Sequence, residues 1–158
     1  MPVLQLRSEL ALHTRCENQI TNEINRESVR FGDALQVADL QKQYRTAMHR
    51  PVQPSRKYNC HGLSFASRRT AIDQTREIKK IVEDDDYKEV SYSNVLPGDI
   101  AVYYSKEGDA EHSGIVVHVD ELRVPIVLSK WGCCHEVVHR VSQCPYEARN
   151  VIYYRVTT

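Results

Sequence analysis

The strongest constraint on the fold is a change in residue pattern at the acidic run 84–86, near the middle of the chain. Before this run, apolar residues recur at loose helical spacing, whereas after it short runs rich in Val, Ile and Tyr are separated by turn residues. β-branched and aromatic residues favour strands. Because helical and strand patterns occupy separate halves of the chain, the sequence predicts an α+β fold with an antiparallel sheet.

Within that fold we expect helices early and strands late. The expected helices cover 17–29, 39–48 and 70–83, and the expected strands cover 87–92, 100–104, 114–119, 124–128, 136–139 and 151–156. A linker with two prolines and three basic residues spans 50–57. We therefore divide the chain into a mostly helical region with its linker, 1–55, and a main domain, 56–158, which together form one compact unit.

Length and charge limit the classes of function. A chain of 158 residues with 41% hydrophobic residues is typical of one globular domain. Its 21 basic and 21 acidic residues balance, which argues against nucleic-acid binding, since that usually needs a basic domain. No window approaches the roughly 18 consecutive apolar residues that a membrane span requires.

The cysteines and the N-terminal residues bear on localisation. An odd number of scattered cysteines is a poor disulfide framework; they are Cys16, Cys60, Cys133, Cys134 and Cys144. Residues 1–9 lack the basic and apolar regions of a signal peptide. We therefore expect synthesis in the cytoplasm, with any export following a route that needs no cleavable leader.

Cys60 is the candidate nucleophile. A cysteine reacts as its thiolate, which a helix N-terminus and a nearby histidine both favour. Cys60 follows an extended, proline-containing segment and begins a run with Leu63 and Phe65 that fits a buried helix. Gly62 keeps the backbone near the sulfur uncrowded, so neighbouring amides could form an oxyanion hole.

His112 is the candidate base, because it begins an apolar strand and so has a fixed backbone. Gly114 leaves room for another element to pass close by. His118 is a rival base, since the two-residue period of a strand places it on the same face as His112. A buried free cysteine and a histidine at a strand edge are also ordinary core features, so pattern alone leaves a structural interpretation open.

Three blocks carry a resemblance to a known family: YNCHGL (58–63), LPGDIAVY (96–103) and HSGIVV (112–117). Their order and rough spacing are similar to those of the NlpC/P60 and CHAP superfamily of papain-like cysteine peptidases and amidases. The resemblance covers about residues 58–119. It implies a papain-like fold, in which a central helix carrying Cys60 packs on an antiparallel sheet.

The resemblance also implies roles for the site residues. Cys60 would attack a carbonyl carbon, and His112 would take the thiol proton and later give it to the leaving amine. A third residue, which orients the imidazole, would come from the next strand, where alternation places Ser129 on one face with Val127. Ser129 can accept a hydrogen bond from the imidazole, whereas charged Lys130 cannot.

The function expected from the resemblance is a cysteine hydrolase that cleaves an amide, peptide or isopeptide bond through a thioester. The partner would be a peptide, peptidoglycan or protein substrate. Asn59 and His61 depart from the usual flanks of the nucleophile, which weakens the inference to peptidoglycan. Two alternatives stay open: a toxin-like deamidase, transglutaminase or acyltransferase acting on a protein, and a non-catalytic domain in which Cys60 and His112 do not meet.

A metal site is a weaker interpretation. Soft ligands gather at Cys133, Cys134, His135 and His139. Adjacent cysteines, however, point to opposite faces of a strand, and structural zinc usually uses pairs separated by two residues. We therefore predict neither a metal nor another cofactor. We interpret His61 as a polar surface or supporting group that points away from the sulfur.

Overall fold

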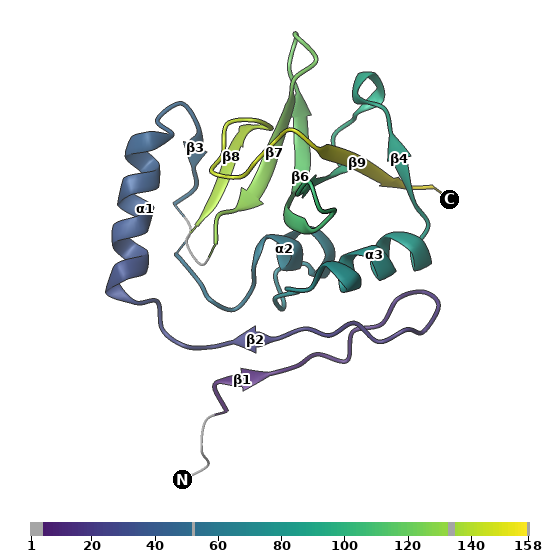
Figure 1. The fold of residues 1–158 in the computed structure, drawn as a ribbon. Helices are drawn as coiled ribbons and strands as arrows, with labels where there is room; N and C mark the ends of the chain where they lie inside the picture. The colour runs from purple at the N-terminus through teal and green to yellow at the C-terminus, as the bar shows by residue number, and fades with distance from the viewer. Residues whose placement is uncertain (1–4, 52, 133–134, 158) are drawn as a thin grey trace.

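A computed structural model describes residues 5–51, 53–132 and 135–157. Over these residues the chain forms a seven-stranded antiparallel sheet, a two-stranded ribbon and three α-helices (Figure 1). The strand order of the large sheet is β3-β8-β7-β6-β5-β9-β4. The α+β prediction is therefore confirmed. None of the helices in these ranges is long and apolar enough to cross a membrane.

Six strands of the large sheet follow the runs that the sequence predicts, whereas β3 (Met48–His49) falls at the end of a predicted helix. The six are β4 (Tyr87–Val90), β5 (Ile100–Tyr104), β6 (Ala110–Val119), β7 (Pro125–Lys130), β8 (Glu136–Arg140) and β9 (Val151–Val156). The ribbon consists of β1 (Arg7–Ser8) and β2 (Ile24–Asn25), and the helices are α1 (Phe31–Gln43), α2 (Cys60–Ala66) and α3 (Thr75–Asp84). A short 3₁₀ turn covers Tyr92–Asn94.

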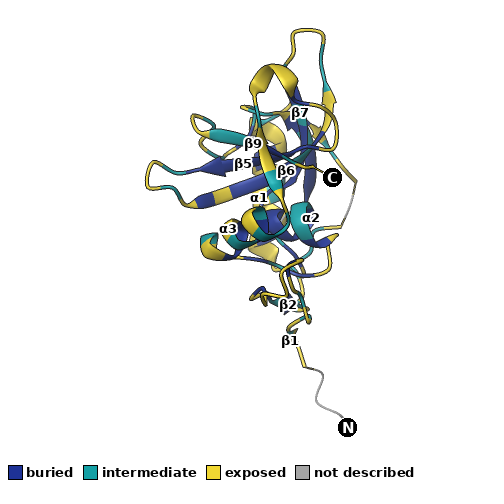
Figure 2. Ribbon diagram, turned by 90° about the vertical axis from the view of Figure 1, so that its right-hand side faces the viewer, coloured by how far each residue is buried: buried dark blue, intermediate teal, exposed yellow. Residues whose placement is uncertain are grey.

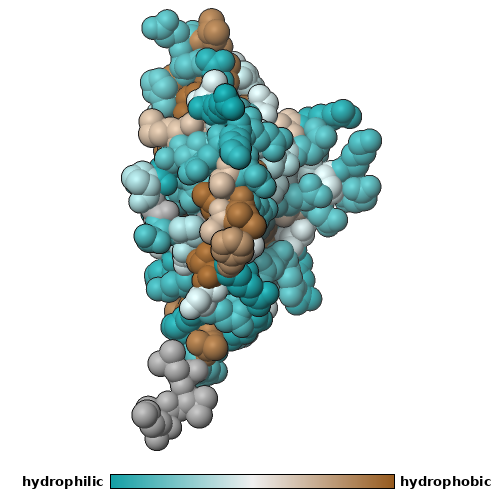
Figure 3. Space-filling model, turned by 90° about the vertical axis from the view of Figure 1, so that its left-hand side faces the viewer, coloured by the Kyte–Doolittle hydropathy of each residue, from teal (hydrophilic) through white to brown (hydrophobic). Residues whose placement is uncertain are grey.

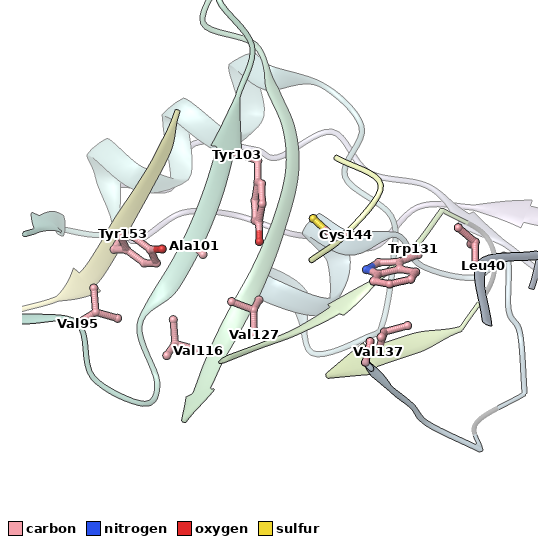
Figure 4. Packing of buried hydrophobic residues seen from close by; sticks show 11 residues of the cluster. Leu40, Val95, Ala101, Tyr103, Val116, Val127, Trp131, Val137, Cys144 and Tyr153 are labelled. Carbon is pink, nitrogen blue, oxygen red and sulfur yellow. The ribbon is translucent and has the colours of Figure 1, made fainter. Parts of the chain in front are cut away.

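Helices cover the two faces of the sheet. On one face, α3 contributes Ile78 and Ile81 to a core shared with Val102 of β5, and α2 lies against β6 and β7. On the other face, Leu40 of α1 joins a core that includes Trp131 (Figure 4). Figure 2 shows buried strands enclosed by more exposed helices and loops. The candidate catalytic residues thus belong to the middle layer and to the helix packed on it.

The helix predicted for 17–29 is wrong, and the helix predicted for 39–48 is displaced, because it overlaps α1 only at residues 39–43. The chain has strand and loop structure through residue 30, and one helix follows it, α1. Asn22 explains part of the difference, because its side-chain amide hydrogen-bonds the backbone of Leu10 and Ile20 and so competes with helical pairing. Asp33 fixes the start of α1, since its carboxylate accepts the Arg30 N–H at 2.8 Å.

One side of α1 stays uncovered. Phe31 is 80% exposed and Leu35 is 53% exposed, while Leu40 on the opposite side is buried. Figure 3, which views the molecule from the α1 side, shows apolar side chains gathered in the middle of a largely hydrophilic face. The helix therefore contributes to the core through a narrow stripe.

At Gly114, β6 packs tightly against β7, its neighbour in the sheet. A Cβ atom there would clash with the Val127 side chain, and it would lie 2.8 Å from the Leu128 carbonyl oxygen and 3.0 Å from Ser129 Cβ. The neighbouring strand therefore fills the space that the missing side chain of Gly114 leaves.

Gly114→Ala should lower the free energy of unfolding by about 1–3 kcal/mol or more, because the added methyl overpacks the strand pair. Gly32→Ala is the matched control, because nothing lies within 4 Å of the point that its added Cβ would occupy. That change in α1 should be neutral or stabilise the protein by up to about 1 kcal/mol. Urea unfolding measures both, and equal midpoints for the two variants would contradict the packing described here.

Candidate active site

Cys60 is the first residue of α2, and Asn59 explains why the helix begins there. The Asn59 side-chain oxygen accepts the Gly62 N–H at 2.8 Å, the arrangement of an N-cap. The same amide group donates to the Ile72 carbonyl at 2.8 Å, which ties the helix start to the segment before α3. The Cys60 side chain is buried, with 8% of its residue surface exposed.

The surroundings of the sulfur act on its pKa in opposite directions. Burial raises the pKa of the Cys60 thiol to about 11. Backbone hydrogen bonds from Ser113 and His61 and the charge of Lys130 lower it, but they offset only part of this effect. The structure therefore holds the thiol protonated at neutral pH, even though groups that favour a thiolate are already in place.

His112 lies on β6 with no solvent exposure. Its ring stacks on Tyr146 with centroids 3.7 Å apart, and Tyr103 meets it edge-on at 5.0 Å. Within the described part of the chain, neither ring nitrogen has a hydrogen-bond partner. Burial, with smaller contributions from His139 and His61, holds the pKa of His112 well below its ordinary value. The imidazole is therefore neutral.

The Cys60 sulfur lies near the backbone of β6 at His112, but the His112 side chain lies on the other face of the strand. The Ser113 hydroxyl lies 2.8 Å from His61 Nδ1 and donates to Ser64 Oγ at 2.9 Å, so Ser113 faces α2. Alternation along a strand then places His112 on the opposite face. A backbone hydrogen bond from Ser113 lowers the pKa of the Cys60 thiol, so the sulfur lies near the peptide group that joins His112 to Ser113.

Ser129 contacts a different histidine from the one expected. It shares a face of β7 with Val127, as predicted, and its Oγ lies 2.7 Å from His139 Nε2. The other nitrogen of His139 lies 2.7 Å from the Arg140 carbonyl and must donate to it, so Nε2 accepts the Ser129 hydroxyl proton. Trp131 Nε1 donates to Ser129 Oγ at 3.1 Å. Ser129 therefore belongs to a buried network with His139 and Trp131.

His118 and His61 lie in environments other than those predicted for them from the sequence. A register shift between Val116 and His118 breaks the two-residue period of β6, and His118 is exposed. It is therefore no rival to His112. His61 is buried, with 3% exposure, and its second nitrogen lies 3.0 Å from the Ala110 carbonyl. It fastens α2 to β6, and nothing in the local sequence distinguishes this role from a surface position.

A buried network of charged side chains lies next to the YNCHGL block, and the sequence patterns do not predict it. Glu136 accepts the Tyr58 hydroxyl at 2.8 Å and two hydrogen bonds from Arg68, and Arg50 lies 3.4 Å away. Burial raises the pKa of Glu136, but the hydrogen bonds from Arg68 and Tyr58 outweigh it and lower the pKa overall. Lys130 lies 4.9 Å from the Tyr58 ring centroid. These residues attach the linker and α2 to the ends of β7 and β8.

The suggested metal ligands do not assemble in the described part of the chain. His135 Nε2 lies 2.7 Å from His49 Nδ1, whereas His139 pairs with Ser129. Cys133 and Cys134 lie outside the described residues. Among the residues that are described, no three His, Cys, Asp or Glu side chains are arranged to hold a metal ion.

Comparisons with known proteins give no assignment. The sequence matches no protein-family model, and neither the curated proteins nor the solved structures provide a match.

Acid should destabilise the fold through its buried histidines. Burial lowers the pKa of His135 and His139 to about 4 and that of His112 well below its ordinary value. As pH falls from about 6.5 toward 4, these histidines bind protons in the unfolded chain but stay neutral in the folded chain. The free energy of unfolding, which is at its full value above pH 6.5, therefore falls by about 1.4 kcal/mol per pH unit for each histidine.

Urea unfolding at pH 7, 6 and 5 measures this loss. His139→Gln should make the slope shallower, whereas exposed His118→Gln should leave it unchanged. A free energy of unfolding that stays constant from pH 7 to 5 would contradict the neutral, buried state of these rings.

The Cys60 thiol should also show its raised pKa directly. In the native protein, the rate of iodoacetamide alkylation at Cys60 should rise about tenfold per pH unit from pH 7 to 9, because the thiolate fraction grows by that factor below the pKa. Exposed Cys16 provides the internal reference. Mass spectrometry assigns the labelled sites, and a rate at Cys60 that levels off below pH 8 would show a thiolate stabilised beyond what this structure provides.

Proposed function

We propose that the protein is a cysteine hydrolase that cleaves an amide, peptide or isopeptide bond through a thioester on Cys60. The observation that carries the proposal is the position of the sulfur. It lies at the first residue of a helix packed on the middle of an antiparallel sheet, and the backbone amides of Ser113 and His61 point at it. This arrangement also supports a papain-like interpretation of the α+β fold.

The protonated thiol makes a base necessary at the moment of reaction, as for a serine hydroxyl. In the proposed reaction, Cys60 Sγ bonds to the substrate carbonyl carbon while the thiol proton passes to His112. The carbon–nitrogen bond then breaks, and the proton leaves with the amine. Water hydrolyses the thioester, which releases a carboxylic acid and restores the thiol.

The protonation state of His112 favours its role as the base, whereas the orientation of its ring opposes that role. It is neutral, and among the described residues neither of its nitrogens has a hydrogen-bond partner to give up when it accepts a proton. Its ring, however, lies on the face of β6 opposite α2, and β6 is paired on both sides. The proposed proton transfer therefore requires β6 to rearrange locally, so that the His112 ring comes to lie on the α2 face.

The amides near the sulfur suggest a second catalytic contribution. The N–H groups of Ser113 and His61 that favour a thiolate are also placed to donate to an oxyanion on an adjacent carbon. Preorganised donors of this kind stabilise the tetrahedral intermediate of acyl transfer. Peptide, peptidoglycan and protein amides all present the required carbonyl group, so the substrate proposal extends to this whole class.

A second candidate function has its own supporting observation. The raised pKa of Cys60 and the opposed directions of the two side chains also fit a non-catalytic binding or structural domain, in which Cys60 is a core residue. Only the first proposal requires a covalent acyl adduct on the sulfur, so trapping that adduct separates the two.

Cys60→Ala should abolish amine release from peptidoglycan or protein substrates and should lower stability by no more than about 1 kcal/mol, the scale of losing one small buried group. Cys144→Ala is the matched control, because Cys144 is equally buried but lies in a loop away from any helix start. The measurements are amine release and, after an acid quench, the mass of the Cys60 peptide. Activity that survives in Cys60→Ala, or substrates that yield neither amine nor acyl adduct, would favour the non-catalytic function.

A further inference from the structure

Three basic side chains border one surface depression at the β4 end of the large sheet (Figure 1). Lys88 comes from β4, Arg155 comes from β9, and Arg123 comes from the turn between β6 and β7. Ser91 and Ser93 also line the depression. Its volume is about 710 Å³, within the range of about 300–1,000 Å³ that small-molecule sites occupy. Three separate segments of the chain thus bring positive charge to one place.

The register of the sheet sets two of these positive charges directly opposite each other. Lys88 pairs with Arg155 across β4 and β9, so both side chains project from the same face of the sheet. Like charges in this position repel each other and destabilise a strand pair. Glu89, which also borders the depression, pairs with Tyr154, and Tyr154 belongs to the core on the other face. The carboxylate of Glu89 therefore does not separate the two cations.

Hydrogen bonds to one short segment hold both guanidinium groups in place. Nη2 of Arg123 donates to the carbonyl oxygens of Ser93 and Val95 at 2.7 and 3.1 Å. Nη2 of Arg155 donates to the carbonyl oxygen of Asn94, between them, at 3.0 Å. Because both groups are already anchored, they lose little conformational entropy when they bind an oxyanion.

Nearby carboxylates balance only part of this positive charge. Asp99 pairs with Arg155 through hydrogen bonds of 2.6 and 2.7 Å. The partners of Arg123 are carbonyl groups, and among the described residues no carboxylate pairs with it. Lys88 Nζ lies 4.0 Å from Oδ1 of exposed Asp86, and an exposed pair at this distance contributes little. The charges of Lys88 and Arg123 therefore stay largely unbalanced.

We propose that this depression binds the phosphate group of a small phosphorylated molecule, with Lys88, Arg123 and Arg155 as the groups that contact it. A phosphate monoester carries a charge of about −1.5 to −2 at pH 7, which complements the unbalanced cations. Its oxygens accept charge-assisted hydrogen bonds from guanidinium and ammonium groups. The depression is larger than a phosphate group, so it also has room for the organic part of the ligand.

The bound anion also gives the unfavourable strand pairing a physical reason. A phosphate between Lys88 and Arg155 converts their mutual repulsion into two attractive contacts. The lining residues belong neither to α2 nor to the groups of the proposed reaction at Cys60. This site therefore does not depend on the proposed hydrolase activity.

Titration of ¹⁵N-labelled protein with phenyl phosphate, at pH 7 and constant ionic strength, tests the site by NMR. Amide signals of residues 88–94 and the side-chain Nε signals of Arg123 and Arg155 should shift and saturate. Arg123→Gln should weaken binding at least about tenfold, because it removes a charged hydrogen-bond donor. Lys106→Gln removes an exposed charge from the turn between β5 and β6, so it is the matched control and should bind like the wild type.

Lys88→Gln guards against an effect of Arg123→Gln on folding alone. Since Lys88 repels Arg155, this variant should melt at a higher temperature than the wild type in low salt without phosphate. Phenyl phosphate should raise the melting temperature of the wild type and raise that of Lys88→Gln by less. A lower melting temperature of Lys88→Gln without ligand, or an equal gain with it, would contradict the proposed site.

Acetate at the same ionic strength distinguishes a phosphate site from a site for any carboxylate. We expect acetate to bind at least about tenfold more weakly, because it carries a single charge. Equal affinity for the two anions would overturn the assignment to phosphate. An absence of saturable shifts at residues 88–94, or shifts that Arg123→Gln and Lys88→Gln leave unchanged, would overturn the site itself. Cys60→Ala should bind phenyl phosphate like the wild type.

Discussion

The alternation of side chains along β6 determines on which face of the sheet His112 lies relative to Cys60. Ser113 points to α2 and is held there by His61 and Ser64, which fixes His112 and Gly114 on the opposite face. Pairing of β6 with β5 on one side and β7 on the other holds these faces in the resting structure. The nucleophile position and the base position are thus adjacent along the backbone while their side chains lie in different layers of the molecule.

Burial outweighs charge around both residues. Amides and an ammonium group favour a thiolate at Cys60, yet the removal of water raises its pKa, and the same effect keeps His112 neutral. Glu136 keeps its charge in the interior because Arg68 pairs with its carboxylate through two hydrogen bonds. In the resting structure, the Cys60 thiol and the His112 imidazole are therefore both uncharged.

Local patterns predict the parts of this structure that depend on local physics. The strands from β4 to β9 and the helix start at Cys60 follow from β-branched runs and from a capping asparagine. The helix predicted for 17–29 fails because Asn22 makes hydrogen bonds to distant backbone that periodicity does not reveal. The face of His112 and the pairing of Ser129 with His139 depend on strand register and a bulge, which are set by contacts between separate segments.

The division of the chain at residue 55 crosses an interface that the sheet depends on. β3 lies before that boundary and pairs with β8 at the edge of the large sheet, and Tyr44 and His49 pack on Trp131. The N-terminal region therefore protects an edge strand whose free N–H and C=O groups would otherwise offer a template for intermolecular pairing. A fragment that begins at residue 56 would expose both that edge and the indole, so aggregation rather than loss of chemistry would be its first defect.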